Sequence, residues 1–367
     1  MKITSVEVFR YELTYNHGIY VMSHGRAQTN EPSLVVKLGT DEGLVGWAET
    51  APHGGTYLPG FFEGELAALA VLGPCVVGLD PREPGTVQAV MARNLLAGMG
   101  AKSAIDTACW DLLGKATGLP VVSLLGGRQQ QSFRVWEAVP LGPPEAMADY
   151  VRTFLAKGVR EFQVKVGNNP YEDARRVDAT MALVNSDSTV IADANGGWNI
   201  QNALIAAREM AGHGIFLEQP CKSLNNCAEV RRHTSLPLIV DECIMTVDDL
   251  VTAKVHAGAG GVNIKPSRVG GLTPARLLRD TATELGMMVT IDDTWGGALI
   301  TAALSHLAAS TKPDSLLATT FFTEFTTPLI ANAPRRQPDG SGAAPPGPGL
   351  GIEVDESLLG APVLRFR

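Results

Sequence analysis

The sequence predicts an α/β protein with a (β/α)₈-type barrel (a modified TIM barrel) and an α+β capping domain. From residue 133 onward, eight short apolar runs alternate with amphipathic helical segments, which is typical of a parallel sheet. Eight such units favour closure into a barrel, because open doubly wound sheets more often have five or six strands. Before residue 118 the order is different, with strands first and helices afterwards.

Composition agrees with a globular protein of about two domains. The 367 residues are 45% hydrophobic and 19% charged, whereas disordered chains combine low hydrophobicity with high charge. The formal net charge is −8 and no Lys/Arg-rich run is present, so we expect neither a nucleic acid nor a membrane as partner. The five cysteines form no CxxC pair, and with no signal peptide found we expect a reduced, cytoplasmic protein.

The capping domain is expected to begin with strands. Residues 3–13 alternate in polarity, and residues 33–50 contain a strand, an Asp-Glu-Gly turn and a second strand, which indicates a hairpin. Residues 62–117 have apolar positions at helical spacing and are predicted to be helical. The polar, glycine-containing segments 14–30 and 52–60 are predicted to be loops that close over the barrel and select the substrate.

The barrel strands are predicted from the apolar runs. These runs span residues 133–139, 162–166, 190–194, 215–219, 238–242, 262–265, 288–293 and 316–320. We place the capping domain at 1–128, the barrel at 129–325 and a C-terminal segment at 326–367. Residues 334–351 are rich in Pro and Gly and are not expected to form regular structure. The residues after them are predicted to be ordered and to return to the cap.

Charged residues recur once per predicted barrel unit, 23 to 28 residues apart. They are Lys165, Asp193, Glu218, Asp241, Lys265 and the pair Asp292 and Asp293. Each therefore falls near the C-terminal end of its strand, where barrel enzymes build their active sites. Since an unpaired buried charge is costly, we interpret the series as a functional site. A buried network of ion pairs is the alternative.

The carboxylates on three adjacent strands, Asp193, Glu218 and Asp241, predict a Mg²⁺ site. All-oxygen ligation suits this cation, with substrate and water filling the remaining positions. Glu242 competes with Asp241 for the third position, and successive strand residues point to opposite faces, so only one of them enters the barrel. We expect Asp241 to be the ligand and Glu242 to orient its neighbours.

Lys165 and Lys265 flank the carboxylates along the chain. The pKa of a lysine near a metal and a second cation can fall toward neutrality, which makes it a usable base. The alternative for each lysine is a salt bridge to a neighbouring carboxylate. Two bases on opposite faces of a metal-bound carboxylate can remove and return an α-proton, with Mg²⁺ stabilising the enediolate. Racemisation, epimerisation, β-elimination and cycloisomerisation all use this chemistry.

On these residues the chain resembles the enolase superfamily, in its muconate-lactonising-enzyme subgroup, over essentially its whole length. Asp193 in DAN, Glu218 in EQP and Asp241 in DE match the metal ligands of that family. Lys165 matches the second lysine of its KxK motif, and Lys265 in NIKPSRVGG matches its strand-six lysine. The resemblance implies Mg²⁺, a small-molecule substrate and a homo-oligomer. The strand-seven histidine of the mandelate-racemase subgroup is absent from IDDTWGG.

One residue departs from the family pattern. Gln163 occupies the position of the first lysine of KxK, which in the family helps to hold the substrate carboxylate and tunes the second lysine. An amide can still donate a hydrogen bond, but it repels Lys165 less. The combination of QVKVG with DDTWGG most resembles the cis-3-hydroxy-L-proline dehydratases of the superfamily.

A cationic imino acid suits the residues expected around the barrel mouth. The capping loops contain Tyr15, His17, Tyr20, His24 and Tyr57. An aromatic wall, with Asp293 and Trp295 on the barrel side, can bind an amine by ion pairing and cation–π contact. The substrate-binding candidates are Gln163, Asp293, Trp295, Tyr57 and His24. Ordinary loop packing is the alternative for the aromatic residues.

The resemblance implies a specific reaction. In cis-3-hydroxy-L-proline the 3-hydroxyl lies on the ring face opposite the Cα hydrogen. We expect Lys165 to take the α-proton and Lys265 to protonate the departing hydroxyl, giving an enamine that tautomerises to Δ1-pyrroline-2-carboxylate. If Lys265 protonates Cα instead, the outcome is 2-epimerisation.

Two alternatives to the dehydratase stay open. A racemase or epimerase of proline, a proline betaine or another amino acid derivative would use the same two lysines. A barrel without activity, serving as a binding scaffold, is the other alternative. The presence of both lysines and all three carboxylates argues against the scaffold.

Overall fold

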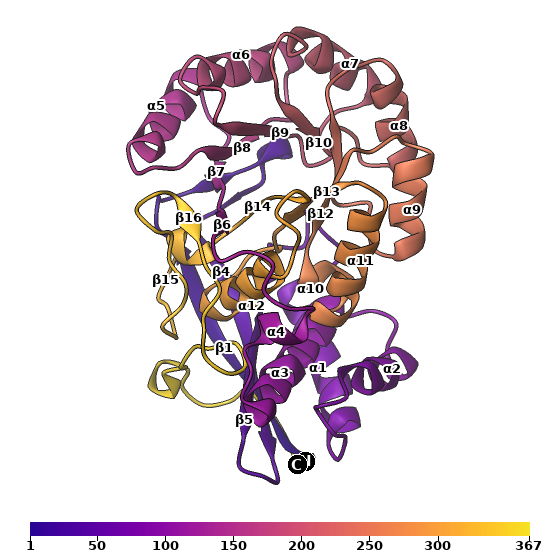
Figure 1. The fold of residues 1–367 in the computed structure, drawn as a ribbon, viewed down its shortest axis with the longest axis vertical. Coiled ribbons are helices and arrows are strands. Elements are labelled where there is room, and N and C mark those ends of the chain that lie inside the picture. Colours follow the sequence, from indigo (N-terminus) through magenta and orange to yellow (C-terminus); the bar gives the residue numbers. More distant parts are fainter.

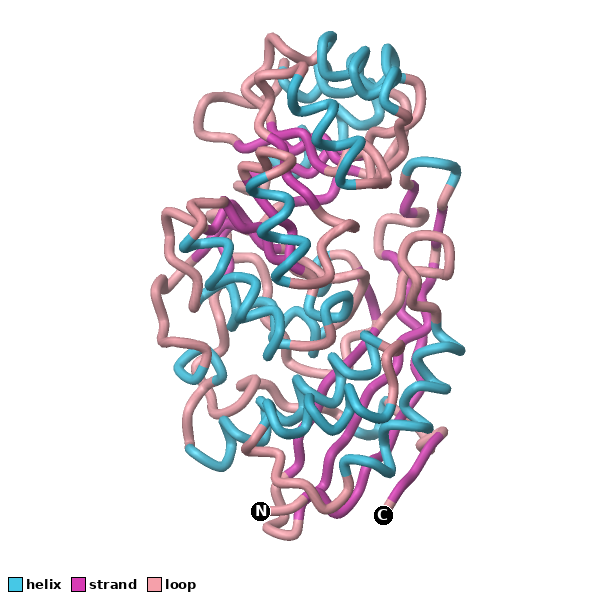
Figure 2. The backbone as a smooth tube through the Cα atoms, turned by 90° about the vertical axis from the view of Figure 1, so that its right-hand side faces the viewer, coloured by secondary structure: helices cyan, strands magenta, loops and turns pink.

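The fold consists of an eight-stranded parallel sheet wrapped by helices and an antiparallel sheet with helices against it (Figure 1). The computed structural model describes residues 1–367. The barrel occupies the upper part of Figure 1 and the cap the lower part. The backbone view in Figure 2 shows both termini at the cap end of the molecule.

The barrel strands follow the chain in order, and each is hydrogen-bonded to the next. They are β7 (Glu137–Val139), β8 (Glu161–Lys165), β9 (Thr189–Asp193), β10 (Phe216–Glu218), β11 (Leu238–Val240), β12 (Gly261–Ile264), β13 (Met288–Ile291) and β14 (Leu316–Thr319). The Trp136 N–H donates to the Thr319 carbonyl (2.9 Å), and Val135 forms a parallel bridge with Thr319. These contacts join the last strand to the start of the first, so the predicted barrel is confirmed.

Helices separate the barrel strands and cover them from outside. They are α5 (Pro144–Leu155), α6 (Pro170–Met181), α7 (Ile200–Glu209), α8 (Leu224–Arg232), α9 (Val247–Val255), α10 (Pro266–Val269), α11 (Leu272–Glu284) and α12 (Ala298–Ala309). Four successive helices, α6 to α9, begin at a residue whose side chain accepts a hydrogen bond from the first turn: Asn169, Asn199, Ser223 and Thr246. Such caps satisfy backbone donors that a helix cannot satisfy itself, and so fix where each helix begins.

The interior of the barrel is a packed core. Trp136, Ile191, Ile239, Leu317 and Ala318 form a buried cluster inside the strands. Side chains alternate between the two faces of a strand, so residues two positions beyond an interior residue also point inward. This alternation carries the inward-facing positions from the apolar core to the C-terminal ends of the strands.

The cap is built on an antiparallel sheet that is covered on both faces. Its strands are β1 (Ile3–Tyr15), β4 (Asn30–Thr40) and β5 (Val45–Thr50), and its helices are α1 (Phe62–Val76), α2 (Pro84–Asn94), α3 (Met99–Thr117) and α4 (Val121–Leu124). One face of the sheet packs on the cap helices through residues such as Leu34 and Val36, whereas Val35 packs into the main core. The C-terminal strand β17 (Leu364–Phe366) pairs with β1, so the chain end returns to the cap.

Three segments differ in detail from the prediction. The first barrel run, 133–139, divides because β6 (Phe133–Arg134) pairs with β16 (Ser341–Gly342) outside the barrel. That pairing also gives the Pro/Gly-rich tail a short regular element, which was not expected. The expected loop 14–30 contains a small hairpin of β2 (Tyr20–Val21) and β3 (Ala27–Gln28), with the 3₁₀ turn Ser23–Gly25 between them. Each of these strands has two residues, too few for a periodic pattern to be recognised.

Specific hydrogen bonds fix the cap on the barrel. Asp106 of α3 accepts bonds from the backbone N–H (2.9 Å) and hydroxyl (2.6 Å) of Thr273 on α11. Thr294, after β13, donates to the carbonyl of Ala51 (2.9 Å), which directly follows β5. The second bond positions the loop that precedes α1 over the C-terminal end of the barrel.

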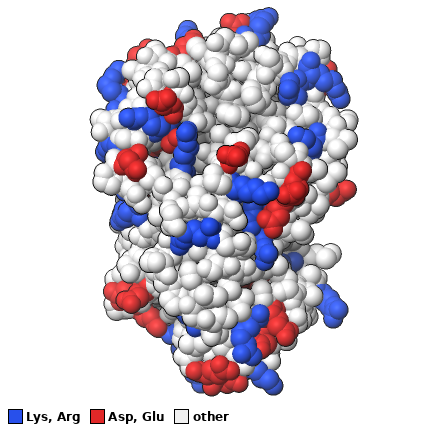
Figure 3. Space-filling model, in the orientation of Figure 1, with Lys and Arg blue, Asp and Glu red and all other residues white.

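The outer surface carries charges of both signs. On the face shown in Figure 3, basic and acidic side chains are interspersed over barrel and cap. Exposed ion pairs such as Arg208–Glu209 (2.9 Å) contribute little to stability, because water screens them. None of the helices is both long enough and apolar enough to cross a bilayer.

His306 on α12 joins three parts of the fold and makes stability depend on pH. Its Nδ1 accepts a hydrogen bond from the Val122 N–H (3.2 Å), and its Nε2 donates to the Leu350 carbonyl (3.1 Å). The side chain is fully buried, and burial lowers the His306 pKa to about 4. A proton on Nδ1 would break the bond from Val122.

We therefore expect the free energy of unfolding to fall as the pH drops from about 6.5 to 4. In this range the unfolded chain binds a proton that the folded chain excludes, which amounts to roughly 3 kcal/mol over the interval. Urea unfolding of the wild type and of His306→Gln at pH 7 and pH 4.5 measures the effect. An equal loss of stability in both proteins would contradict this assignment.

Candidate active site

Both predicted lysines and four of the predicted substrate-binding residues line a cavity at the C-terminal ends of the barrel strands, beneath the cap. Polar residues of the barrel form its floor and part of its side, namely Gln163, Lys165, Lys265, Asp292 and Asp293. Aromatic residues form much of the rest, namely Tyr20, His53, Tyr57, Trp136, Trp295, Phe322 and Phe325. Tyr20, His53 and Tyr57 belong to the cap and the other aromatic residues to the barrel, so both parts of the chain enclose the cavity.

Lys165 and Asp193 form a buried ion pair at one side of the site. They are neighbours in register on β8 and β9, and the lysine Nζ lies 2.5 Å from the Asp193 Oδ2. Burial alone would lower the pKa of Lys165, but Asp193, Tyr20 and Glu218 together outweigh burial and raise it. In this arrangement Lys165 is held in its ammonium form.

Glu218 at the end of β10 lies next to Asp193 and is held by two amides. The Gln163 Nε2 donates to its Oε2 (2.9 Å) and the Asn263 Nδ2 donates to its Oε1 (2.8 Å). Burial raises the pKa of Glu218 well above its usual range, and repulsion from Asp193 and Asp241 raises it further. The three carboxylates are therefore close enough to destabilise one another's charge.

Asp241, two residues after Ile239 of the barrel core, is held by cations. Its Oδ1 is hydrogen-bonded to the Arg268 guanidinium, and its Oδ2 lies 2.9 Å from the Lys265 Nζ. Burial opposes the charge of Asp241, yet Lys265 and Arg268 prevail and lower its pKa. The Lys265 ammonium also lies 3.6 Å from the Asp292 Oδ2 and donates to the Tyr57 hydroxyl (2.5 Å).

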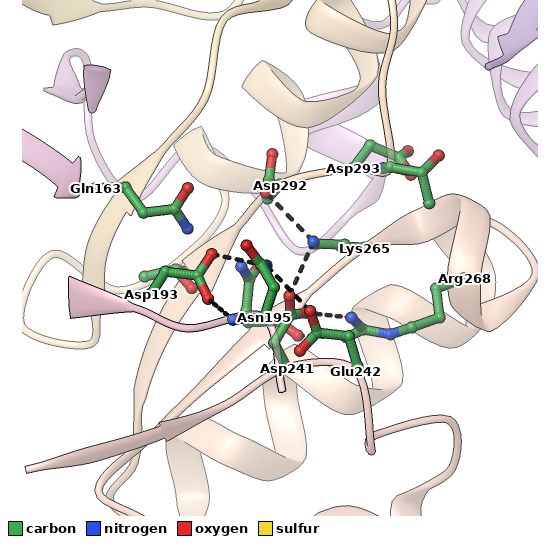
Figure 4. Close-up of polar contacts among 12 residues, drawn as sticks. Gln163, Asp193, Asn195, Asp241, Glu242, Lys265, Arg268, Asp292 and Asp293 are labelled. Carbon is green, nitrogen blue, oxygen red and sulfur yellow. Dashed lines mark hydrogen bonds and ion pairs between the residues drawn. The ribbon is translucent and has the colours of Figure 1, made fainter. Parts of the chain in front are cut away.

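Glu242 lies on the other side of Asn195 from Asp193. The Asn195 Nδ2 donates both to Asp193 Oδ2 (2.9 Å) and to Glu242 Oε1 (3.0 Å), as Figure 4 shows. The second oxygen of Glu242 is buried without a hydrogen-bond partner. Burial, then repulsion from Asp241 and Asp193, raises the Glu242 pKa to about 7.

The donor set fits a hard divalent cation. In the structure the carboxylate oxygens contact ammonium, guanidinium and amide groups. No three His, Cys, Asp or Glu side chains lie close enough together to hold one metal ion. Even so, the carboxylates outnumber the three cations Lys165, Lys265 and Arg268, and the pKa values of Glu218, Glu242 and Asp292 are raised above their usual range. All-oxygen ligands with excess negative charge are what Mg²⁺ prefers.

The two lysines approach the cavity from opposite walls. Lys165 ends β8, the second barrel strand, and Lys265 follows β12, the sixth. These two strands are four positions apart in a barrel of eight, which is half of its circumference. Both side chains line the same cavity, so a small molecule bound there has one lysine on each side.

The predicted substrate-binding residues are not all in the cavity. Gln163, Trp295 and Tyr57 line it, with Gln163 also bonded to Glu218. Asp293 lines it as well, but its carboxylate accepts bonds from the N–H groups of Ser267 (3.2 Å) and Thr294 (2.8 Å). Asp292, not Asp293, faces Lys265 (Figure 4).

His24 lies outside the cavity. It is exposed in the 3₁₀ turn between β2 and β3, and it lines an outer vestibule with Arg26 and Lys222. Its backbone N–H bonds to the Asn168 side chain (3.0 Å), and its φ of 60° is left-handed.

Several residues that hold the site were not predicted. Asn195 and Asn263 stand two positions from Asp193 and Lys265, so strand alternation places them on the same inward face. Arg268 follows Lys265 by three residues, the spacing that returns to the same side of a helix. These spacings are readable from the sequence. The pairing of His53 with Glu31 (2.6 Å) joins residues 22 positions apart, and no local spacing indicates it.

Similarity to known proteins extends over the whole chain. Residues 5–126 match the mandelate racemase / muconate lactonizing enzyme N-terminal domain, and residues 146–358 match the enolase C-terminal domain-like family. A cis-3-hydroxy-L-proline dehydratase of Roseibium aggregatum is 38% identical, covering 100% of both chains. An N-succinyl-L-Arg/Lys racemase of Bacillus cereus is 31% identical, covering 98% of this chain and 97% of the relative.

Solved structures agree with the sequence similarity. A mandelate racemase/muconate lactonizing enzyme from Roseovarius nubinhibens, complexed with magnesium, superimposes with a TM-score of 0.97 at 34% identity. Each of the two chains is covered completely. The N-succinyl Arg/Lys racemase structure from Bacillus cereus gives a TM-score of 0.93 at 30% identity, covering 100% of this chain and 99% of the other.

Arg268 is expected to stabilise the fold through Asp241. Arg268→Met leaves the buried Asp241 with Lys265 as its remaining cation, and breaking a buried ion pair costs about 3 kcal/mol. Urea unfolding should report this loss, and the double variant Arg268→Met/Asp241→Asn should recover part of it, since the uncompensated charge is then gone. A single variant as stable as the wild type would contradict the expected coupling.

Proposed function

The chain belongs to the mandelate racemase / muconate lactonizing enzyme family of the enolase superfamily, and from that premise we propose that it is a Mg²⁺-dependent cis-3-hydroxy-L-proline dehydratase. It would remove the α-proton and eliminate the 3-hydroxyl as water, giving Δ1-pyrroline-2-carboxylate. Enolase-superfamily membership makes the protein an enzyme. The identity of the substrate and the elimination are the proposal.

The observation that carries the proposal is the placement of Lys165 and Lys265 on opposite walls of one cavity. The cis isomer has its Cα hydrogen and its 3-hydroxyl on opposite ring faces. A base on one side and an acid on the other match this arrangement. A protein that only binds its ligand has no need of two buried lysines beside buried carboxylates, and burying such charges is costly.

We assign the metal ligands as Asp193, Glu218 and Asp241. Ile191 and Ile239 lie in the interior core, and strand alternation supports inward orientation for Asp193 and Asp241, two positions further on. Glu242, which follows the end of β11, accepts a hydrogen bond from Asn195 instead. When bound, Mg²⁺ would supply electrophilic stabilisation of the negative charge that develops on the substrate carboxylate.

The chain's own residues would perform the proton transfers. Lys165 takes the α-proton in its neutral amine form, which loss of the Asp193 contact would favour because burial then lowers the pKa of Lys165. Lys265, as an ammonium, gives a proton to the departing hydroxyl on the other side of the ring. Tyr57 receives a hydrogen bond from Lys265 and donates one to Asp241 (3.2 Å), which fixes the direction of the ammonium. The aromatic wall would exclude water from the cavity. The amine of the substrate ring would then lie against Trp295 in a cation–π contact.

Two findings favour elimination over epimerisation as the main outcome. The 38% identical relative over the full length is named as a dehydratase, whereas the racemase relative is 31% identical. The cavity is enclosed by aromatic side chains, which suits a small ring better than an N-acylated amino acid. Epimerisation at C2 remains the second candidate, because Lys265 lies where it can return a proton to Cα.

Proton NMR in D₂O with Mg²⁺ tests the proposal on a panel of proline, hydroxyproline isomers and proline betaines. We expect the signals of cis-3-hydroxy-L-proline to be replaced by those of Δ1-pyrroline-2-carboxylate. Deuteration at Cα of another panel member without elimination would contradict the dehydratase and support the epimerase. No reaction with any panel member would exclude both imino acid assignments.

Variants of the two lysines separate their roles. Lys165→Ala should lower the rates of both α-deuteration and elimination by roughly 10²- to 10⁴-fold. Lys265→Ala should lower the rate of elimination by the same factor, while α-deuteration continues. The same NMR assay reads both events in one sample. If Lys265→Ala lost α-deuteration and Lys165→Ala kept it, the base and the acid would have to be exchanged.

A further inference from the structure

His53 and Glu31 form a buried pair on the cap side of the active-site cavity. His53 follows β5, and Glu31 is the second residue of β4. The His53 Nδ1 lies 2.6 Å from the Glu31 Oε1, and each side chain is 3% exposed. Neither atom has a partner in aligned hydrogen-bond geometry, so this close contact is the compensation that each buried atom has.

Aromatic contacts hold the His53 ring in a fixed place. It stacks on Trp295 with the ring centroids 4.8 Å apart and the planes at 21°. Tyr20 and Tyr57 touch it edge-on, at centroid distances of 5.9 Å and 6.1 Å. The imidazole thus forms part of the aromatic wall, between the cap and the barrel.

The contact with Glu31 decides which ring nitrogen of His53 is the donor and which is the acceptor. A carboxylate beside Nδ1 requires a hydrogen on that nitrogen, and in neutral imidazole the other nitrogen is then an acceptor. The contact with Glu31 is made by Nδ1 and leaves Nε2 for another partner, and His53 lines the cavity that contains both lysines. Nε2 is therefore the ring atom available to a ligand.

We propose that His53 determines specificity for substrates with a protonated secondary amine, by accepting a hydrogen bond from the ring ammonium at Nε2. The inference rests on the proposed function, because it concerns the imino acid bound between Lys165 and Lys265. A carboxylate–imidazole pair recognises an N–H donor, whereas Trp295 alone recognises any cation through its ring face. Amines without an N–H, such as N,N-dimethyl-L-proline, gain nothing from His53.

The role differs from those of the other polar residues. Asp293 is engaged with backbone N–H groups, and Asp292 faces Lys265. Gln163 and Asn263 donate to Glu218. On the cap side of the cavity, His53 is the residue that offers a ring nitrogen as an acceptor. Glu31 acts through it as a positioning residue.

Competitive inhibition measures the contribution of the hydrogen bond. L-Proline and N,N-dimethyl-L-proline are compared as inhibitors of cis-3-hydroxy-L-proline turnover by the Mg²⁺-loaded wild type and by His53→Phe, which keeps an aromatic ring against Trp295. A hydrogen bond to a charged donor is worth about 10- to 100-fold in affinity. For His53→Phe we expect the affinity for L-proline to fall by this factor and the KM for cis-3-hydroxy-L-proline to rise by it. We expect kcat and the affinity for N,N-dimethyl-L-proline to change about threefold or less.

Two further variants guard against a purely structural effect. His53→Gln retains an acceptor and should recover part of the affinity for L-proline, and Glu31→Gln should weaken L-proline more than its dimethyl analogue. His233→Phe, a matched change at an exposed histidine on the outer surface, controls for the substitution itself. Equal losses for both inhibitors in His53→Phe would overturn the inference.

The two proposals fail in different ways. If the wild type turns over cis-3-hydroxy-L-proline but His53→Phe does not distinguish the two inhibitors, the dehydratase stands and the role of His53 is wrong. If the wild type neither turns over an imino acid nor binds L-proline by calorimetry, the proposed function is wrong and the inference falls with it.

Discussion

The cost of burying several carboxylates side by side governs the architecture of this protein. Asp193, Glu218 and Asp241 are fully buried within one end of the barrel, and like charges at such short range cannot all be ionised without compensation. The compensating groups come from β8, the loop after β9, β12 and the start of α10. They are Gln163, Lys165, Asn195, Asn263, Lys265 and Arg268. Only a closed barrel brings these segments to one point. The packed interior core beneath them sets the depth at which the charges lie.

The cap completes what the barrel cannot supply alone. Tyr57 reaches from the loop after β5 to bond Lys265 and Asp241, and His53 stacks on Trp295 from the same loop. These contacts join the cap to the reactive lysine and to the aromatic wall. The hydrogen bond from Thr294 to Ala51 fixes the loop at its base, so one short segment orients Lys265 and, under the proposed function, contacts the substrate.

The sequence predicted the barrel and most of the site because both follow a regular spacing. A charge every 23 to 28 residues marks one inward position per strand, and alternation then indicates Asn195 and Asn263. What spacing does not encode is which partner a side chain takes. Asp293 was expected to face the substrate, but the N–H groups of Ser267 and Thr294 hold it. His24 was expected to contact the substrate, and it lines the outer vestibule rather than the cavity that contains the two lysines. The pair His53 and Glu31 depends on strand register in the cap, which two separate segments define only after folding.

The central claim is that the buried carboxylates form a cation site and that the lysines paired with them are the reactive groups. A crystal structure of the protein with Mg²⁺ and L-proline tests it most directly. The account predicts Mg²⁺ bound to Asp193, Glu218 and Asp241, with the Lys165 Nζ moved from Asp193 toward Cα on one ring face and Lys265 on the other. Mg²⁺ bound elsewhere, with the Lys165–Asp193 and Lys265–Asp241 contacts unchanged, would contradict it.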